Sequence, residues 1–283
     1  FPPIISPPWF LPGKGFNSLP TAVFPDGTQK HRLTSDKFDN SQPAWSPDGS
    51  QIAFLSDRSS GSMQVHILNP ENASIQQITS DLDGVEDLIW LPEGDQIILW
   101  AKTGDETWGW LAVDLVSKDV RPMPGWSQDG SFWPASFSHD GTRLAYLSNL
   151  QQESRTSPGI QIHIQNRDGS GDFVLTPEVW DYRSPMWSPD DSQIAFLSNQ
   201  GNPGKQFAIY LVDADGSNLR QVSQFMFSQA ISLTWSPDGQ QIAVNADRSI
   251  YTVDLNSSEI QKLFTLEEQD TLGSLSWQPA ERP

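Results

Sequence analysis

A five-residue turn motif recurs along the chain and limits the folds available to it. The motif starts with an aromatic residue, continues as Ser-Pro-Asp-Gly or a close variant, and precedes an alternating apolar run. Four clear copies occupy residues 45–49, 137–141, 187–191 and 235–239, and weaker copies start at Trp90 and Trp277. Successive copies start 45, 47, 50, 48 and 42 residues apart, a period that predicts a propeller or a solenoid.

Each repeat has room for four short strands. In the first clear unit, strand-like segments occupy residues 43–45, 51–56, 64–68 and 74–79. Pro47 presets the first turn torsion, the Asp48 side chain can bond back to the backbone, and Gly49 accepts a positive φ. Asp191 replaces this glycine in a later copy, which is tolerable because Asp enters the left-handed region more readily than most residues.

A lone four-stranded sheet cannot bury both of its faces, whereas sheets arranged radially bury them against each other. We therefore expect an all-β fold, a six-bladed β-propeller of four-stranded antiparallel blades. The recurring tryptophans are expected in the core between blades; they are Trp45, Trp90, Trp187, Trp235 and Trp277.

The two chain ends are expected to form one composite blade that closes the ring. Residues 272–277 resemble a first strand, and residues 19–34 align with the third and fourth strands of a later unit. Ile4 and Ile5 could supply the second strand. We therefore expect an extended N-terminal segment at residues 1–18, which could join this blade, and a single propeller at residues 19–283.

Charge and composition exclude several classes of protein. The 35 acidic residues exceed the 17 basic ones, giving a formal net charge of −18, which opposes binding to nucleic acid or to an anionic membrane surface. With no Cys, disulfides, Cys-ligated zinc and a Cys nucleophile are excluded. No apolar window approaches the roughly 18 residues of a membrane span. Phe1 at the start fits either an exported protein whose signal was removed or a trimmed chain.

The repeats resemble those of the TolB-type propeller family, a PD40 or WD40-like repeat that also occurs in relatives of prolyl oligopeptidase. The resemblance rests on Trp-Ser-Pro-Asp-Gly-x-x-Ile-Ala-Phe leading to Ile-Tyr-x-x-Asp-x-x-Gly and Leu-Thr, and it covers about residues 19–277. It implies a non-catalytic scaffold for partner proteins, periplasmic or otherwise extracytoplasmic, in the bacterial cell envelope or a larger assembly. Within these 283 residues we expect neither the separate amino-terminal domain of TolB nor an α/β-hydrolase domain, and there is no Gly-x-Ser-x-Gly elbow.

The four histidines do not predict a metal or catalytic site. His66 and His163 occupy the third-strand position that holds Tyr210 and Tyr251 in other units, which favours a structural role. No His-x-x-x-His spacing is present. The oligogalacturonate lyases, which resemble this repeat, hold a metal with several histidines that this chain does not match. We expect no cofactor; calcium is possible, although no Asp-x-Asp-x-Asp-Gly loop supports it.

The segments that lead into the innermost strands and the loops between second and third strands are expected to surround one channel mouth, where recognition residues commonly lie. Aromatic residues and Arg there are typical of protein-binding hot spots. We predict a protein or peptide partner held chiefly by Trp133, Tyr182 and Arg183. Further candidate contacts are Asn40, Glu86, Asp87, Trp108 and Trp110. Alternation places Trp108 and Trp110 on the same side of a strand, where they either cap a blade or expose an aromatic patch.

Two alternatives stay open. A carbohydrate-active hydrolase or lyase could use channel carboxylates such as Asp39, Asp87 and Asp181, possibly with a metal, because the separation of a carboxylate pair depends on the fold. A cluster of inward polar residues from several units would favour that enzyme. The chain could instead be a structural subunit that contacts its partners through blade edges.

Overall fold

The computed structural model describes residues 4–5, 21–22, 31–32, 38–59, 61–104, 107–123, 126, 132–148, 160–178, 180–202, 206–223, 226–265 and 275–278. For residues before 38 and for residues 132–135, the description covers the backbone only. The described part of the chain is all β, and it contains no helix that could cross a membrane.

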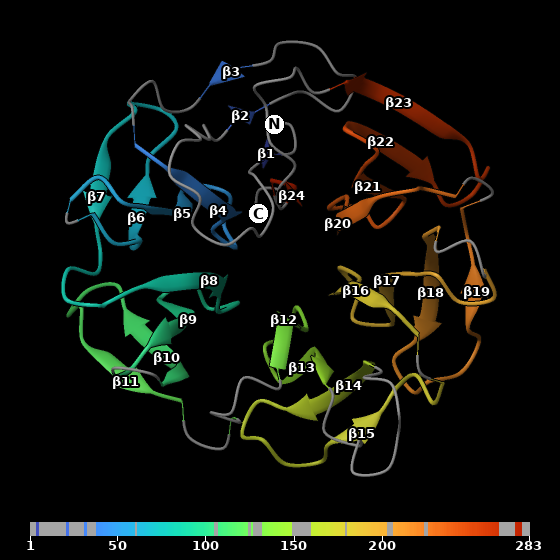
Figure 1. Ribbon diagram of the computed structural model, residues 1–283, viewed down its shortest axis with the longest axis horizontal. Coiled ribbons are helices and arrows are strands. Elements are labelled where there is room, and N and C mark those ends of the chain that lie inside the picture. Colours follow the sequence, from blue (N-terminus) through green and yellow to red (C-terminus); the bar gives the residue numbers. More distant parts are fainter. Residues whose placement is uncertain are drawn as a thin grey trace.

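Five four-stranded antiparallel sheets are each built from one continuous stretch of chain and surround a common centre as the blades of a propeller (Figure 1). Blade 1 contains β4 (Asn40–Trp45), β5 (Ile52–Ser56), β6 (Gln64–Leu68) and β7 (Ile75–Gln77). Blade 2 contains β8 (Val85–Trp90), β9 (Gln96–Lys102), β10 (Trp108–Asp114) and β11 (Val120–Pro122). Blade 3 contains β12 (Phe132–Phe137), β13 (Arg143–Ser148), β14 (Gln161–Asn166) and β15 (Phe173–Val174).

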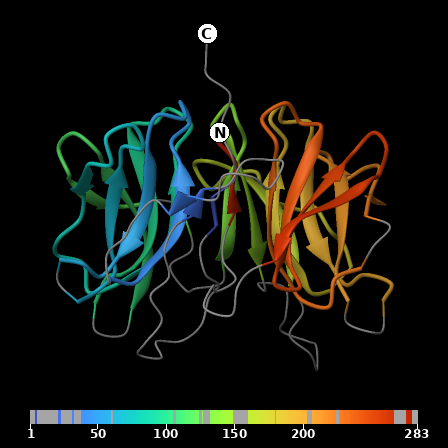
Figure 2. The ribbon, with the colours of Figure 1, turned by 90° about the horizontal axis from the view of Figure 1, so that it is seen from above.

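Blade 4 contains β16 (Tyr182–Trp187), β17 (Gln193–Ser198), β18 (Ala208–Asp213) and β19 (Arg220–Gln221). Blade 5 contains β20 (Ala230–Trp235), β21 (Gln241–Ala246), β22 (Ser249–Asp254) and β23 (Ile260–Thr265). The first strand of each blade lies nearest the centre and the fourth lies at the periphery (Figure 1). In the view turned by 90°, the strands run roughly along the axis of the ring (Figure 2).

The two ends of the chain meet in a composite sheet of order β24-β1-β2-β3. Its strands are β24 (Leu275–Ser276), β1 (Ile4–Ile5), β2 (Thr21–Ala22) and β3 (His31–Arg32). These segments and their order are the ones expected from the sequence. Ser276 also accepts a hydrogen bond from the Trp45 backbone N–H at 3.1 Å, so this sheet contacts blade 1. Residues 6–20 lie outside the described part, and the division at residue 18 stays a prediction.

The repeated turn folds as its residues predict. Ser46 donates its hydroxyl to Asp48 at 2.6 Å, Asp48 accepts the Ser50 N–H at 3.0 Å, and Gly49 has φ 71°. The same serine–aspartate bond recurs in blades 3, 4 and 5. Because hydrogen bonds stabilise the charged form, the pKa of Asp140 falls to about 2.

Turns of neighbouring blades also contact each other. A Cβ at Gly94 would lie 3.8 Å from Pro47, and one at Gly239 would lie 3.7 Å from Pro189. Asp191, at φ 58°, takes the glycine position opposite His139. His139 has the backbone N–H that proline lacks, and the Asp191 carboxylate accepts it together with the N–H of the next residue. Asp191, which the sequence analysis expected to be tolerated in place of glycine, therefore links blades 3 and 4.

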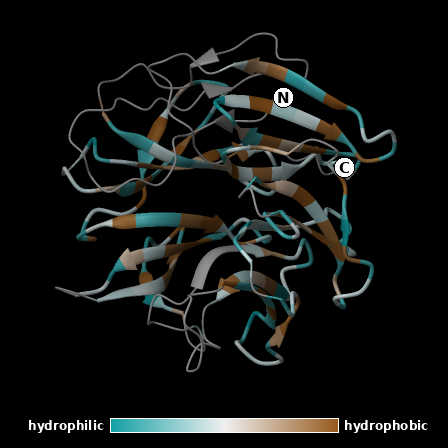
Figure 3. Cartoon of the chain, turned by 45° about the vertical axis from the view of Figure 1, so that its right-hand side comes forward, coloured by the Kyte–Doolittle hydropathy of each residue, from teal (hydrophilic) through white to brown (hydrophobic). Residues whose placement is uncertain are grey.

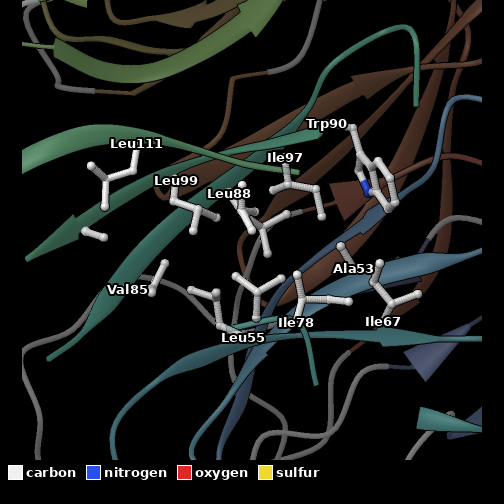
Figure 4. Packing of buried hydrophobic residues seen from close by; sticks show 13 residues of the cluster. Ala53, Leu55, Ile67, Ile78, Val85, Leu88, Trp90, Ile97, Leu99 and Leu111 are labelled. Carbon is white, nitrogen blue, oxygen red and sulfur yellow. The ribbon is translucent and has the colours of Figure 1, made fainter. Parts of the chain in front are cut away.

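Aliphatic residues fill most of the space between blades, and the apolar residues concentrate in the strands (Figure 3). Between blades 1 and 2, the buried cluster includes Leu55, Leu88 and Leu99, with Trp90 at its edge (Figure 4). The Trp90 indole N–H donates to the Ala44 carbonyl of the preceding blade at 3.1 Å. The core role expected for the recurring tryptophans is confirmed at positions 45, 90, 187 and 235, which are 6–7% exposed. Trp277 is partly buried.

Candidate functional site

Every innermost strand of the five blades changes register near its first residues. The irregularities lie between Ser41 and Ala44, Val85 and Asp87, Trp133 and Ser136, Arg183 and Met186, and Ala230 and Ser232. Two bulge residues, Gln42 and Ser184, have φ values of 51° and 50°. A bulge re-aims side chains and is common beside functional sites. All five irregularities therefore lie toward the start of an innermost strand, the end predicted to face the channel mouth.

A repeated hydrogen bond fixes the backbone just before three of these strands. Asp57 accepts the Asp39 N–H at 3.0 Å, Asn199 accepts the Asp181 N–H at 3.1 Å, and Asp247 accepts the Gln229 N–H at 2.8 Å. Each acceptor directly follows the second strand of its blade. The sequence carries this signal, an Asp or Asn after each of these strands, but the sequence analysis missed it.

Arg183 connects blades 4 and 5. It donates two hydrogen bonds to Asp181, at 3.3 and 2.9 Å, and its Nη1 donates to the Ala230 carbonyl at 2.8 Å. Its guanidinium carbon lies 4.0 Å from the centre of the Phe207 ring. The side chain is 40% exposed, so a predicted partner contact is also a structural link between two blades.

Two other predicted contact residues belong to the interior. Tyr182 is 1% exposed, packs edge-on against Phe196, and donates its hydroxyl to the Glu178 carbonyl. Asn40 is fully buried and accepts a hydrogen bond from Arg58 at 2.8 Å. The prediction that these side chains contact a partner is corrected here, because both are buried, Tyr182 in a cluster that it shares with blade 3.

The acidic pair on β8 divides between surface and interior. Glu86 is exposed, whereas Asp87 is 9% exposed and lies opposite Trp100 in the sheet. Burial raises the pKa of Asp87 to about 7, despite the hydrogen bond that it accepts from the Leu88 N–H. Burial also raises the pKa of Glu86. A carboxyl that holds its proton near neutral pH can act as a general acid.

The other two carboxylates weighed for catalysis come from different blades. Burial and the charge of Asp57 raise the pKa of Asp39 in blade 1, while Asp181 in blade 4 pairs with Arg183. Among the described residues, no group of three or more His, Asp or Glu side chains is arranged to hold a metal ion.

The tryptophans of β10 are on the same side of their strand, as alternation predicts. Trp100 lies 6.3 Å from Trp108 and 5.2 Å from Trp110, measured between ring centres. Trp110 is 1% exposed and Trp108 is partly buried. Of the two alternatives left open by the sequence, the blade cap is the one observed for Trp110, and its burial corrects its assignment as a partner contact. Trp133 has its backbone in β12, and its side chain lies outside the described residues.

The two buried histidines occupy the position predicted for them. His66 pairs with Phe54 and His163 with Tyr146, as Tyr210 pairs with Phe196. Both imidazoles are tilted against the ring opposite them, with ring centres 5.7 and 5.3 Å apart. Their place in the third strand is therefore confirmed.

Comparison with known proteins agrees with this architecture. Residues 126–281, more than half of the chain, match the TolB beta propeller domain family, PD40. The chain belongs to this family. The crystal structure of TolB from Acinetobacter baumannii is similar with a TM-score of 0.76 and 17% identity, over 99% of this chain and 67% of that one.

Two sequence relatives carry peptidase names. The uncharacterized peptidase YuxL of Bacillus subtilis is 26% identical over 56% of this chain, and dipeptidyl-peptidase 5 of Porphyromonas gingivalis is 23% identical over 84%. This TolB-family chain spans 22% and 42% of the lengths of those relatives.

Proposed function

We propose that this chain is a non-catalytic, TolB-like propeller that holds a protein or peptide at its channel mouth. One observation carries the proposal. Just before the innermost strands, hydrogen bonds fix the backbone, while the side chains differ from blade to blade. Asp57, Asn199 and Asp247 bind equivalent backbone N–H groups, yet the residues beside those groups differ from blade to blade. A rigid frame that carries variable residues suits recognition.

The second part of the proposal concerns how the ring closes. We infer that β24, β1, β2 and β3 act as the sixth blade, so that the ring closes through both ends of the chain. Closure of this kind would hold the channel mouth in a constant shape. The family resemblance supports an extracytoplasmic location, in the cell envelope or a larger assembly.

The test uses exposed residues at the mouth, because substitution there leaves the core intact. Glu86 and Gln229 are exposed, and Glu86→Ala and Gln229→Ala are expected to weaken crosslinking to the native partner without changing the melting temperature. Glu71→Ala is the matched control, since Glu71 is exposed on the turn after β6. Equal crosslinking by all three variants would contradict a partner at the mouth.

One observation favours a second candidate, a carbohydrate-active hydrolase or lyase. Asp87 has a pKa of about 7, which suits a general acid on the innermost strand of blade 2. A screen of neutral and acidic polysaccharides, with and without divalent metals, tests this candidate. Turnover that Asp87→Asn abolishes would establish the enzyme and contradict the binding-only function.

A further inference from the structure

Two asparagines of the chain begin an Asn-x-Ser sequence. The two sequences are Asn-Ala-Ser at residues 72–74 and Asn-Ser-Ser at residues 256–258. A sequence of this form, with any middle residue except proline, is the acceptor for N-linked glycosylation. The first lies in the turn between β6 and β7 of blade 1, and the second lies in the turn between β22 and β23 of blade 5. Both therefore occupy the connection between the third and fourth strands of a blade.

Both acceptor asparagines are on the surface. Asn72 and Asn256 are exposed, whereas Asn40 and Asn245, which do not begin such a sequence, are fully buried. The fourth strands β7 and β23 form the outer edges of their blades (Figure 1). A glycan is bulky and needs a surface position. The two turns supply one at the periphery of the ring.

The turn around Asn72 presents its amide nitrogen to solvent. Asn72 Oδ1 accepts the Ser74 N–H at 2.9 Å, and Ala73 between them has φ 57°, which together form an Asx-turn. The bond uses the amide oxygen and leaves Nδ2, the atom that would carry the sugar. Neither this nitrogen nor the Ser74 hydroxyl has a hydrogen bond to any described residue. Both groups of the acceptor sequence are therefore available to an enzyme.

Asn256 has the same availability through a different arrangement. Asp254 Oδ1 accepts the backbone N–H of Asn256 at 3.0 Å and that of Ser257 at 2.8 Å. This turn is therefore held by the aspartate, and the acceptor side chain takes no part in it. Within the described part of the chain, the Asn256 amide and the Ser258 hydroxyl have no hydrogen-bond partner.

The two turns lie at the end of their blades that faces away from the predicted channel mouth. Each third strand runs antiparallel to the second, which ends at the mouth. In blade 5, the Leu255 N–H donates at 2.9 Å to the carbonyl of Gln240, which directly follows the repeated turn between the first and second strands. Sugar chains on this side would leave the mouth uncovered.

We propose that Asn72 and Asn256 are N-glycosylated. The co-reactant is a lipid-linked sugar pyrophosphate, used by an oligosaccharyltransferase. The amide nitrogen forms a bond to the anomeric carbon of the sugar, and the bond from that carbon to the pyrophosphate oxygen breaks. The lipid pyrophosphate leaves with the bonding electrons, and the amide proton passes to a base of the transferase. This inference rests on the extracytoplasmic location in the proposed function and is independent of a partner at the mouth.

The experiment is mass spectrometry of peptides from the protein isolated from its native cells after cell fractionation. Peptides that contain Asn72 and Asn256 are expected to carry added sugar mass. Asn218 is an internal control, because it is exposed in the equivalent turn of blade 4 but is followed by Leu-Arg. Its peptide should have the unmodified mass.

Two substitutions at Ser74 make a matched pair. Ser74→Ala removes the hydroxyl that the acceptor sequence requires, whereas Ser74→Thr keeps one. Added mass at Asn72 should be lost completely in Ser74→Ala and retained in Ser74→Thr, while Asn256 stays modified in both. Exported protein without sugar at either asparagine would overturn the proposal, as would sugar that persists at Asn72 in Ser74→Ala. Protein found only in the cytoplasm would overturn the proposed location as well, and the crosslinking variants at the mouth test the partner separately.

Discussion

Two seams of the same propeller use opposite chemistry. Between blades 1 and 2, the buried cluster is almost entirely aliphatic, and its one tryptophan, Trp90 of blade 2, donates its N–H to a carbonyl of blade 1. Between blades 2 and 3, tryptophans, a histidine and a glutamine meet, and three buried nitrogens have no partner among the described residues. The second and third strands pair at equivalent positions in blades 1, 2 and 3. The arrangement of the strands therefore does not determine which residue types are buried between two blades. Polar and aromatic residues can occupy one seam while aliphatic residues fill another.

The largest change in stability is expected from the seam between blades 1 and 2, which is filled by aliphatic residues. Leu99 is fully buried there, and Leu99→Ala should lower the free energy of unfolding by about 3–5 kcal/mol through lost burial and a residual cavity. Urea unfolding measures the change. Val116→Ala, at a position 91% exposed, is the control and should be near neutral. A loss below about 1 kcal/mol at Leu99 would mean that this seam is loosely packed.

The stability of the folded protein should depend on pH through Asp87, which lies on the innermost strand of blade 2. The folded state raises the pKa of this carboxyl from 3.8 to about 7, so its contribution to stability is complete below about pH 4 and is lost as the pH rises to 7. Asp87→Asn stays neutral throughout. Its stability relative to wild type should therefore increase by about 2–4 kcal/mol between pH 4 and pH 8, at about 1.4 kcal/mol per unit of pKa shift. Denaturant unfolding of both proteins at pH 4 and at pH 8 measures this change. If the two proteins differed in stability by the same amount at both pH values, the raised pKa of Asp87 would be refuted.

A smaller effect of opposite sign to Leu99→Ala is expected from the unpaired amide. Gln165→Val introduces the residue found at this position in blades 2, 4 and 5. The change should raise the free energy of unfolding by about 1 kcal/mol, because a buried donor without a partner is removed. Thermal and urea unfolding check the sign. Destabilisation would show that the Gln165 amide is already paired.

The smallest expected effect concerns the next seam, between blades 3 and 4. His139→Pro removes one of the two backbone donors to the Asp191 carboxylate, and Asp191→Gly removes the acceptor of both donors. The double variant restores the proline–glycine contact of other seams. A double-mutant cycle should show a coupling of about 0.5–1 kcal/mol. Strict additivity would mean that the short contact contributes nothing to stability.

Local sequence patterns gave most of the architecture. The turn residues and alternating runs predicted the strands, and Pro47, Asp48 and Gly49 play the turn roles expected of them. The composite pairing of both ends followed from aligning residues 19–34 with a complete unit. These features were predictable because they depend on neighbours along the chain or on a repeat that the sequence displays several times.

The site was less predictable. Tyr182 and Asn40 looked like mouth residues, yet both are buried, because proximity to a strand's start does not fix which way a side chain points. The register shift at each first strand changes that direction. Glu86 and Asp87, adjacent in sequence, consequently differ in exposure and in surroundings.

The sequence alone determined the repeat, its turns and the all-β blades, since turn torsions and strand periodicity are local properties. Only the tertiary structure decided which blade faces meet. The packing of blade 2 against blade 3 turned scattered residues such as Trp110, His163 and Gln165 into one seam. Burial then determined which hydrogen bonds these residues can make, because a polar atom removed from water depends on the neighbouring blade for its partners.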